Sequence, residues 1–414
     1  MYVALYSYSV SGIVMILMAT HVDDVIWASE PEFETIVQEM QRALQLGALE
    51  ECSFRFCGVE MKQDLDTFAV TITCSSTWEK LTQARLSKER SQQLDDAERE
   101  QFQSMVGSLM WICRCCRPTV GHTASTLQSA GKKPIVEDML KCNRCVRYAK
   151  ETKDVGLTYK TGVHWPSRAG EKMELCIAAV SDASHGNEFE YLDDWELRES
   201  FRSQGAQVTM FTNTNATLEE EVRCHLISFS STVQQRVVNS TIKSETYQLS
   251  DVVESADLIR AAIADVHGAL DHKQWETTAA KFMKSVRLTD CPRAYDTLQK
   301  PVARTIYKRL GMELVSLRQF LWKKPGEGCV DVKLSEERCA DPTDIIRWID
   351  TTVMVADCLT RPMKGGFLHI VVDTNIWNFE QTAEARSVKL KKQIQMGAYG
   401  GRTPRRRSFH RSEY

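Results

Sequence analysis

The sequence predicts a mixed fold of the α+β and α/β type. Short apolar runs bounded by turn residues, typical of strands, occur in the first 75 residues and again after residue 173. Residues 76 to about 160 are polar and follow a helical pattern instead, and a long amphipathic helix begins at Ser244. With 414 residues, 43% hydrophobic and 26% charged, the chain is an ordinary globular protein of roughly two or three domains.

The first twenty residues carry no charge and predict a β-hairpin. Ser11 and Gly12 interrupt the apolar run at the place of a turn. A membrane-spanning segment is the alternative, because the stretch approaches the length of a spanning helix. Neither a basic leader nor a small-residue cleavage site of a secretory signal is visible. We expect the hairpin.

Two adjacent carboxylates, Asp23 and Asp24, stand between the apolar runs 13–20 and 25–28. This pattern predicts a strand, a tight turn and a second strand, with both carboxylates at an exposed tip. Paired carboxylates can hold the divalent metals that steer phosphoryl transfer. The alternative is an ordinary solvated turn.

The remainder of the first part predicts one helix, strands and then a helical region. The helix is expected at 32–46, with Gly47 at its end, and strands are expected at 54–61 and 68–73. The helical region should bury Leu109, Ile112, Leu127, Met139, Val146 and Tyr148. Residues 166–170 are typical of a linker.

Fourteen cysteines without a secretory signal indicate a reducing compartment. Two C-x-x-C pairs, Cys113 with Cys116 and Cys142 with Cys145, have the form of four zinc ligands. Both pairs fall in helix-like stretches, and the gap between them exceeds the usual zinc-ribbon spacing. We therefore expect cysteines packed in helices, with a zinc-organised binding module as the alternative.

The second part alternates strands with helices. Strands are expected at 175–180, 206–212, 225–230, 285–288 and 345–349. Helices are expected from Ser244 to Gly268, at about 303–322 and near 355–359.

Acidic residues fall at the ends of these elements. Asp182 ends the first strand, Glu245 opens the long helix, Asp290 follows the fourth strand, and Asp357 opens the final helix. Acids at the ends of neighbouring strands can converge at one edge of a sheet, an arrangement suited to two-metal phosphodiester hydrolysis with Mg²⁺ or Mn²⁺. Each acid also has a plainer interpretation as a first-turn charge or a turn residue. Asp296 competes with Asp290 for the third position.

Basic residues suggest nucleic-acid contacts. The segment from residue 381 is strongly basic, and Arg405, Arg406 and Arg407 are typical of phosphate binding or nuclear localisation. A solubilising tail is the alternative. Lys308, Arg309 and Arg318, on the predicted helix after Asp290, are either phosphate contacts or part of a solvated helix face.

The sequence resembles the C-terminal part of the polyprotein of copia-type LTR retrotransposons, that is, the end of the reverse transcriptase followed by its ribonuclease H. His21-Val22-Asp23-Asp24 is similar to the Tyr-Val-Asp-Asp signature of reverse transcriptases, with His21 in place of Tyr. The other matching stretches follow in the family's order: 56–60, 107–111, 117–118 and 147–157 in the first part, then 182–184, 240–241, 244–246 and 355–363.

The resemblance implies a division of the chain. It implies a partial polymerase palm (1–75), a helical thumb or connection (76–165), a ribonuclease H-like mixed sheet flanked by helices (171–375) and a basic mobile tail (376–414). The acidic stretch 188–199 and the tail depart from the family's pattern.

The resemblance also implies an activity. Asp182, Glu245, Asp290 and Asp357 carry over as metal-binding acids that cleave RNA in RNA–DNA hybrids. Polymerase activity is not expected, because the family's upstream carboxylate and template-gripping fingers would precede Met1. The alternative is an inactive or domesticated fragment that binds nucleic acid. We expect a cytoplasmic or nuclear protein that does not bind membranes.

Overall fold

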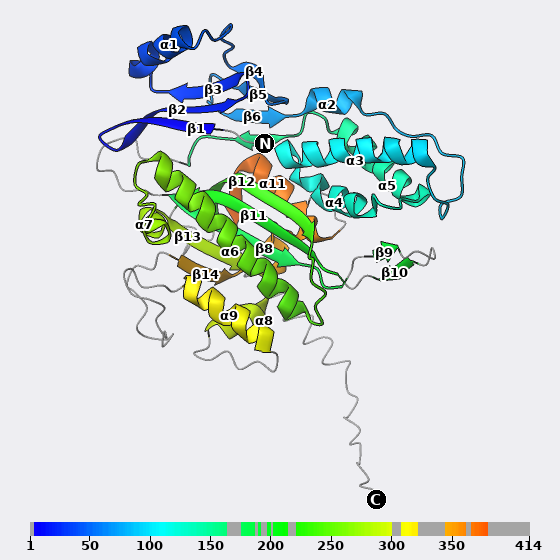
Figure 1. Ribbon diagram of the computed structural model, residues 1–414. Helices are drawn as coiled ribbons and strands as arrows, with labels where there is room; N and C mark the ends of the chain where they lie inside the picture. Colours follow the sequence, from blue (N-terminus) through cyan, green and yellow to red (C-terminus); the bar gives the residue numbers. More distant parts are fainter. Residues whose placement is uncertain are drawn as a thin grey trace, which may run out of the picture.

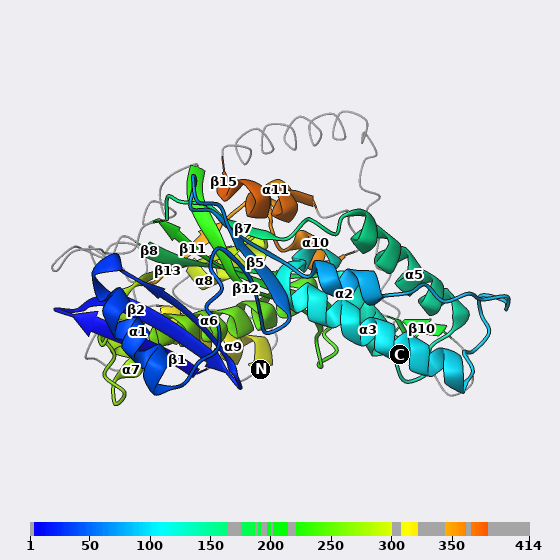
Figure 2. The ribbon, with the colours of Figure 1, turned by 90° about the horizontal axis from the view of Figure 1, so that it is seen from above.

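The computed structural model describes residues 4–163, 175–186, 189–191, 197–199, 202–213, 221–299, 308–321, 344–361 and 366–379. Within these ranges helices and several β-sheets are mixed, which confirms the predicted mixed fold (Figure 1). Seen from above, a small sheet with one helix lies at one end and a group of helices at the other, with a larger sheet between them (Figure 2). No helix in the described ranges is long and apolar enough to cross a membrane.

The first sheet is the predicted hairpin extended by one strand. It consists of β1 (Ala4–Val10), β2 (Ile13–His21) and β3 (Asp24–Ser29), all antiparallel. Ser11 and Gly12 both have positive φ (53° and 81°), as a tight two-residue hairpin turn requires. Helix α1 (Glu34–Ala43) follows. It is shorter than predicted, because Gln45 and not Gly47 takes the left-handed conformation after it.

A second sheet joins two distant segments of the chain. It contains β4 (Ser53–Phe56), β5 (Val59–Gln63), β6 (Val70–Thr73) and β7 (Leu157–Tyr159). The prediction of one strand at 54–61 is wrong, because Cys57 and Gly58 have positive φ (50° and 83°) and form a two-residue turn. Strand β7 was not predicted. It pairs with β6 after the whole helical region has intervened.

The helical region contains α2 (Ser75–Lys80), α3 (Asp96–Cys116), α4 (Gly121–Ala130) and α5 (Val136–Glu151). Asp95 and Glu98 form a capping box that starts α3. Arg117, buried at the end of α3, donates to the carbonyl oxygens of Thr152 (2.6 Å) and Val155 (3.2 Å). This guanidinium therefore fixes the end of α3 to the segment that leads into β7.

The largest sheet has the strand order β14-β13-β8-β11-β12-β15. Strands β8 (Leu175–Ala183), β11 (Gln204–Asn213) and β12 (Glu221–Val233) are antiparallel neighbours, whereas β13 (Lys284–Thr289) and β14 (Asp344–Trp348) run parallel to β8. Strand β15 (Ile376–Asn378) pairs with the far side of β12. It lies inside the segment predicted as the tail, so the described fold extends past residue 375.

Each face of this sheet is covered by helices. On one face, α6 (Thr241–Val266) packs on β8, and α9 (Lys308–Leu321) packs against α6 and β14; Leu175, Ile177 and Ala179 of β8 share one buried cluster with both helices. The alternate residues of β8 face a second core, which contains α10 (Asp357–Thr360), α11 (Gly366–Thr374) and the helical region. Helices α7 (Trp275–Phe282) and α8 (Pro292–Gln299), like α11, were not predicted.

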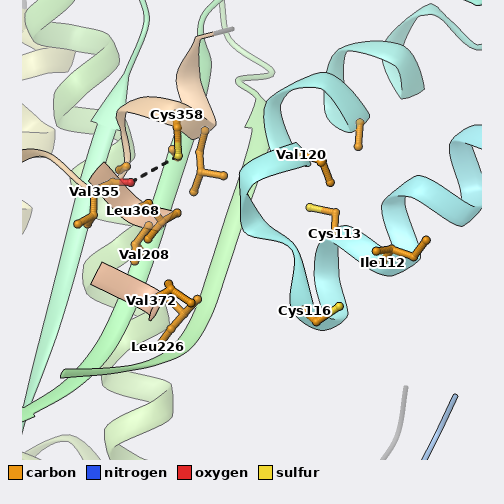
Figure 3. Close-up of a cluster of buried hydrophobic side chains, with 14 of the residues drawn as sticks. Ile112, Cys113, Cys116, Val120, Val208, Leu226, Val355, Cys358, Leu368 and Val372 are labelled. Atoms are coloured by element: carbon orange, nitrogen blue, oxygen red, sulfur yellow. Dashed lines mark hydrogen bonds between the residues drawn. The ribbon is translucent and has the colours of Figure 1, made fainter. Parts of the chain in front are cut away.

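The second core is continuous between the helical region and the large sheet. Cys113 and Val120 from the helical region belong to the same buried cluster as Val208 and Leu226 of the sheet and Cys358 of α10 (Figure 3). The segments predicted as a connection and a nuclease unit therefore share one hydrophobic core.

Several predicted segments lie partly or wholly outside the described residues. They include the linker at 166–170, the first residues of the helix expected at 303–322, and the tail with Arg405, Arg406 and Arg407. Of the acidic stretch 188–199, β9 (Phe189–Tyr191) and β10 (Leu197–Glu199) are described, and they pair antiparallel.

Candidate metal centre

Three aspartates from three separate elements meet at the end of two parallel strands. Asp182 is the penultimate residue of β8, and Asp290 directly follows β13, whose last residue Thr289 pairs with Ser181. This register places Asp290 beside Asp182. Asp357 is the first residue of α10. One carboxylate oxygen from each of the three lies within 4.8 Å of the other two.

Neighbouring side chains orient these carboxylates. The Thr360 hydroxyl donates a hydrogen bond to Asp182 Oδ2. The Arg361 guanidinium donates to Asp357 Oδ1 at 2.7 Å, and its side chain is 47% exposed. Trp348 Nε1 donates to the backbone oxygen of Asp290 at 3.1 Å and so holds the chain where it leaves β13. The centre is therefore fixed from both the sheet and α10.

Glu245 lies next to the three aspartates without joining their closest group. The sequence predicted that it opens the long helix, but α6 begins at Thr241, so Glu245 projects from the second turn. It is only 5% exposed. Its Oε2 atom is buried without a hydrogen-bond partner. A buried acceptor with no donor is a position where a bound cation or its water would be stabilised.

Burial and mutual repulsion raise the pKa of all four acids. The pKa of Asp182 rises to about 6 through burial first and the charge of Asp357 second. The pKa of Asp290 also rises to about 6, through burial and then the charge of Asp182. The pKa values of Glu245 and Asp357 are raised as well, again chiefly by burial. These groups resist ionising together unless a positive charge joins them.

The donor set fits a hard divalent cation. Carboxylate oxygens are the ligands preferred by Mg²⁺, Mn²⁺ and Ca²⁺, whereas zinc sites favour nitrogen and sulfur. The three aspartates could hold such an ion, and the oxygens do not by themselves select one of these metals.

Of Asp290 and Asp296, the structure places only Asp290 in the acidic group. Asp296 lies on α8, where it is exposed, and it is not part of the acidic group. The sequence left both open because they are six residues apart after the same strand. Only the register of β13 against β8 distinguishes them.

Asp23 and Asp24 are placed as predicted, at an exposed hairpin tip between β2 and β3. Asp24 Oδ2 accepts a hydrogen bond from the backbone of Cys57 at 3.4 Å. Among the described residues, no third acid, histidine or cysteine joins them in a metal-binding group.

The cysteines of both C-x-x-C pairs lie in helices, as predicted, with Cys113 and Cys116 on α3 and Cys142 and Cys145 on α5. All four are buried. Burial raises the pKa of Cys113, Cys142 and Cys145 to about 12, which disfavours the thiolate that a metal requires. They form no metal-binding group in the part of the chain that the structure describes.

Of the three basic residues predicted on the helix after Asp290, two are exposed and one bonds to the protein itself. Lys308 and Arg309 are exposed at the start of α9. Arg318 donates instead to the backbone oxygens of Leu298 (3.2 Å) and Thr297 (2.7 Å), so it stabilises the end of α8.

Thr360 and Arg361 are the contacts that the sequence reasoning missed. Both lie in the stretch that begins at Asp357, but neither was given a role. The four-residue spacing from Asp357 to Arg361 was the available signal, since such pairs lie side by side on a helix.

Comparison with protein-family models gives no match, and no curated protein sequence matches the chain. The chemistry of the centre is therefore argued from its geometry.

Proposed function

We propose that this chain is a ribonuclease H-type endonuclease that cleaves the RNA strand of RNA–DNA hybrids with Mg²⁺ or Mn²⁺, and that it corresponds to the C-terminal part of a copia-type retrotransposon polyprotein. One observation carries the proposal. Three aspartate carboxylates from three elements lie within 4.8 Å of one another at the ends of adjacent parallel strands.

The sheet supports the same reading. Three antiparallel strands, the long helix α6 and two further parallel strands make a mixed sheet flanked by helices, which is the architecture that the resemblance implies. A fold hosts many functions, so the strand order supports the proposal only together with the carboxylates.

The residues of the centre have different roles in this proposal. Asp182, Asp290 and Asp357 would hold the cation, and Glu245 Oε2 offers a further oxygen. When bound, the metal would activate a water molecule and stabilise charge on the phosphate. Thr360 keeps the Asp182 carboxylate in position, and the half-exposed Arg361 guanidinium supplies a positive charge at the rim that a phosphate can meet.

Asp23 and Asp24 have no part in this proposal. Their hairpin is retained from the polymerase family, but two carboxylates without a third ligand among the described residues do not make a polymerase centre.

The test is cleavage of labelled RNA–DNA hybrid by the purified full chain. We expect Mg²⁺-dependent cleavage that falls at least about 100-fold in Asp182→Asn and in Asp290→Asn. Asp296→Asn is the matched control, because it makes the same change at an exposed acid on the next helix, and its rate should stay within about twofold of wild type.

Two results would contradict the proposal: no Mg²⁺-dependent cleavage, or equal cleavage by wild type and Asp182→Asn. Hybrid that is bound but never cleaved would favour the alternative of an inactive fragment that binds nucleic acid.

A further inference from the structure

A pocket with a mixed polar and apolar lining lies where the helical region meets the large sheet. It has a volume of about 250 Å³ and lies between α3, α4 and β12. Its polar lining includes Arg114, Gln128, Ser129, Ser230 and Thr232. We refer to it as the Arg114 pocket.

The charge of the Arg114 pocket favours an anion. Arg114 is exposed on α3 and forms no ion pair with any described carboxylate. None of the described residues that line the pocket is acidic. Hydroxyl, amide and guanidinium groups together are the side chains that proteins use for the phosphates and sugars of nucleic acids.

The size of the pocket limits the ligand. At about 250 Å³ it is smaller than the roughly 300–1,000 Å³ of sites for drug-sized molecules. The partly buried ring of Phe229 and the side chain of Met110 add an apolar wall. A single phosphate with its sugar suits this combination of size, charge and lining.

The register of the sheet fixes where the pocket lies relative to the metal centre. Ala206 of β11 pairs with Asp182 on one side and with Ser231 of β12 on the other, so the three form one row across the sheet. Ser231 belongs to the pocket lining. Asp182 and Ser231 are therefore two strand spacings of about 4.8 Å apart, which is roughly 10 Å.

Helix α10 joins the two sites. Ser231 Oγ donates to the backbone oxygen of Leu359 at 2.6 Å, and the next residue, Thr360, donates to Asp182. Gln204 holds the pocket wall, because its Nε2 donates to Ser125 Oγ (3.0 Å) and Ser231 Oγ (2.7 Å). Hydrogen bonds through α10 therefore connect the pocket to the carboxylates.

We propose that the Arg114 pocket binds a phosphate–sugar unit of the nucleic-acid duplex whose scissile bond lies at the carboxylates. The inference rests on the proposed function, and it assigns the helical region a direct role in holding the substrate. Because the contact is to the backbone, it acts equally on every base sequence.

The test measures binding alone. The full chain carrying Asp182→Asn, which prevents cleavage, is titrated against fluorescent RNA–DNA hybrids of two unrelated sequences over a range of salt concentrations. Adding Arg114→Gln should weaken binding about tenfold on both sequences and reduce the salt slope by about one. Arg147→Gln is the matched control: Arg147 is an exposed arginine on α5, outside the pocket lining and without an ion pair among the described residues, and its loss should change affinity less than twofold.

A second variant tests the cavity itself. Ser129→Trp places a bulky side chain at an exposed lining position, leaves the charge unchanged, and should also weaken hybrid binding. Equal affinity of the Arg114 and Arg147 variants, or undiminished binding by Ser129→Trp, would overturn the inference while leaving the proposed function intact. If the wild-type chain neither binds nor cleaves the hybrid, the proposed function fails. The inference rests on that function and then fails too.

Discussion

Asp182 is an acid that the fold holds almost completely out of water, at 2% exposure. Its raised pKa means that the folded protein keeps a proton on this group at a pH where the unfolded chain has lost it. Stability from this group is therefore highest at low pH, and it is lost as the pH rises from about 4 through about 6. At neutral pH, ionisation of these buried carboxylates lowers the free energy of unfolding unless a cation is bound.

The free energy of unfolding of the metal-free protein should show this destabilisation. At pH 7.5, Asp182→Asn should be more stable than wild type by roughly 3 kcal/mol, because a pKa raised from 3.8 to about 6 corresponds to that free energy. Below about pH 4 the advantage should disappear, since the aspartate is then protonated in both states. Urea unfolding in the presence of a chelator gives both values, and Mg²⁺ should stabilise the wild type more than the variant. An advantage that does not change with pH would contradict the assignment.

The members of the acidic centre could be predicted from sequence, but their arrangement could not. Asp182, Glu245, Asp290 and Asp357 were identified because acids at the ends of strands and helices stand out in a sequence. The choice of Asp290 over Asp296 depends on a strand register that periodicity does not contain. The pairing of Arg361 with Asp357 had only one sequence signal, their four-residue spacing, because the helix between them has only four residues and gives no periodic pattern.

At the scale of elements, Gly156 and Gly107, which both follow a valine, differ in the space around the position of a Cβ atom. A Cβ on Gly156 would lie 2.0 Å from the backbone oxygen of Ile72, so only glycine allows the chain to approach β6 before β7 begins. A Cβ on Gly107, within α3, would meet nothing within 4 Å.

The two alanine substitutions should therefore have opposite effects. Gly156→Ala should lower the free energy of unfolding by at least about 2 kcal/mol, because the backbone of β6 must move away. Gly107→Ala should raise it by about 0.5–1 kcal/mol, because alanine favours a helix interior and finds open space. Urea unfolding of both variants checks this, and a stable Gly156→Ala would show that β7 does not pair closely with β6.

Long periodic elements were predicted well, and short or interrupted ones were not. Helix α6 was found because its apolar residues recur over about five turns, from Leu249 to Val266, although its start was placed one turn late. The turn at Cys57-Gly58 was missed because the residues around it are uniformly strand-like. Strands β7 and β15 are three residues each, which is too short for a periodic signal.

At the scale of the whole molecule, the helical region and the large sheet share one hydrophobic core. Leu109 and Leu127 of the helical region, Val208 of the large sheet and Trp377 of β15 belong to the same buried cluster. Amphipathic patterns show that a face is buried but not what covers it, so the packing of the helical region against the large sheet could not be predicted from the sequence.

This shared core predicts the behaviour of fragments. Residues 171–414 expressed alone should expose the apolar surface that α3 and α4 cover, bind a hydrophobic dye and aggregate. The control is residues 1–379, which keeps every described element and should unfold in a single transition like the full chain. A cooperative unfolding transition of 171–414 with an unchanged midpoint would show that the large sheet is an independent domain.

The position of Trp377 near the end of the described residues also sets the timing of folding during translation. This side chain is fully buried, packs against Phe379 and donates to the backbone of Val353, so the interior closes only after it has been made. The helical region ends at Glu151, and ribosomes add roughly 5–20 residues per second. The nascent chain therefore carries the uncovered helices for roughly 10–45 s, the interval in which a chaperone would find them.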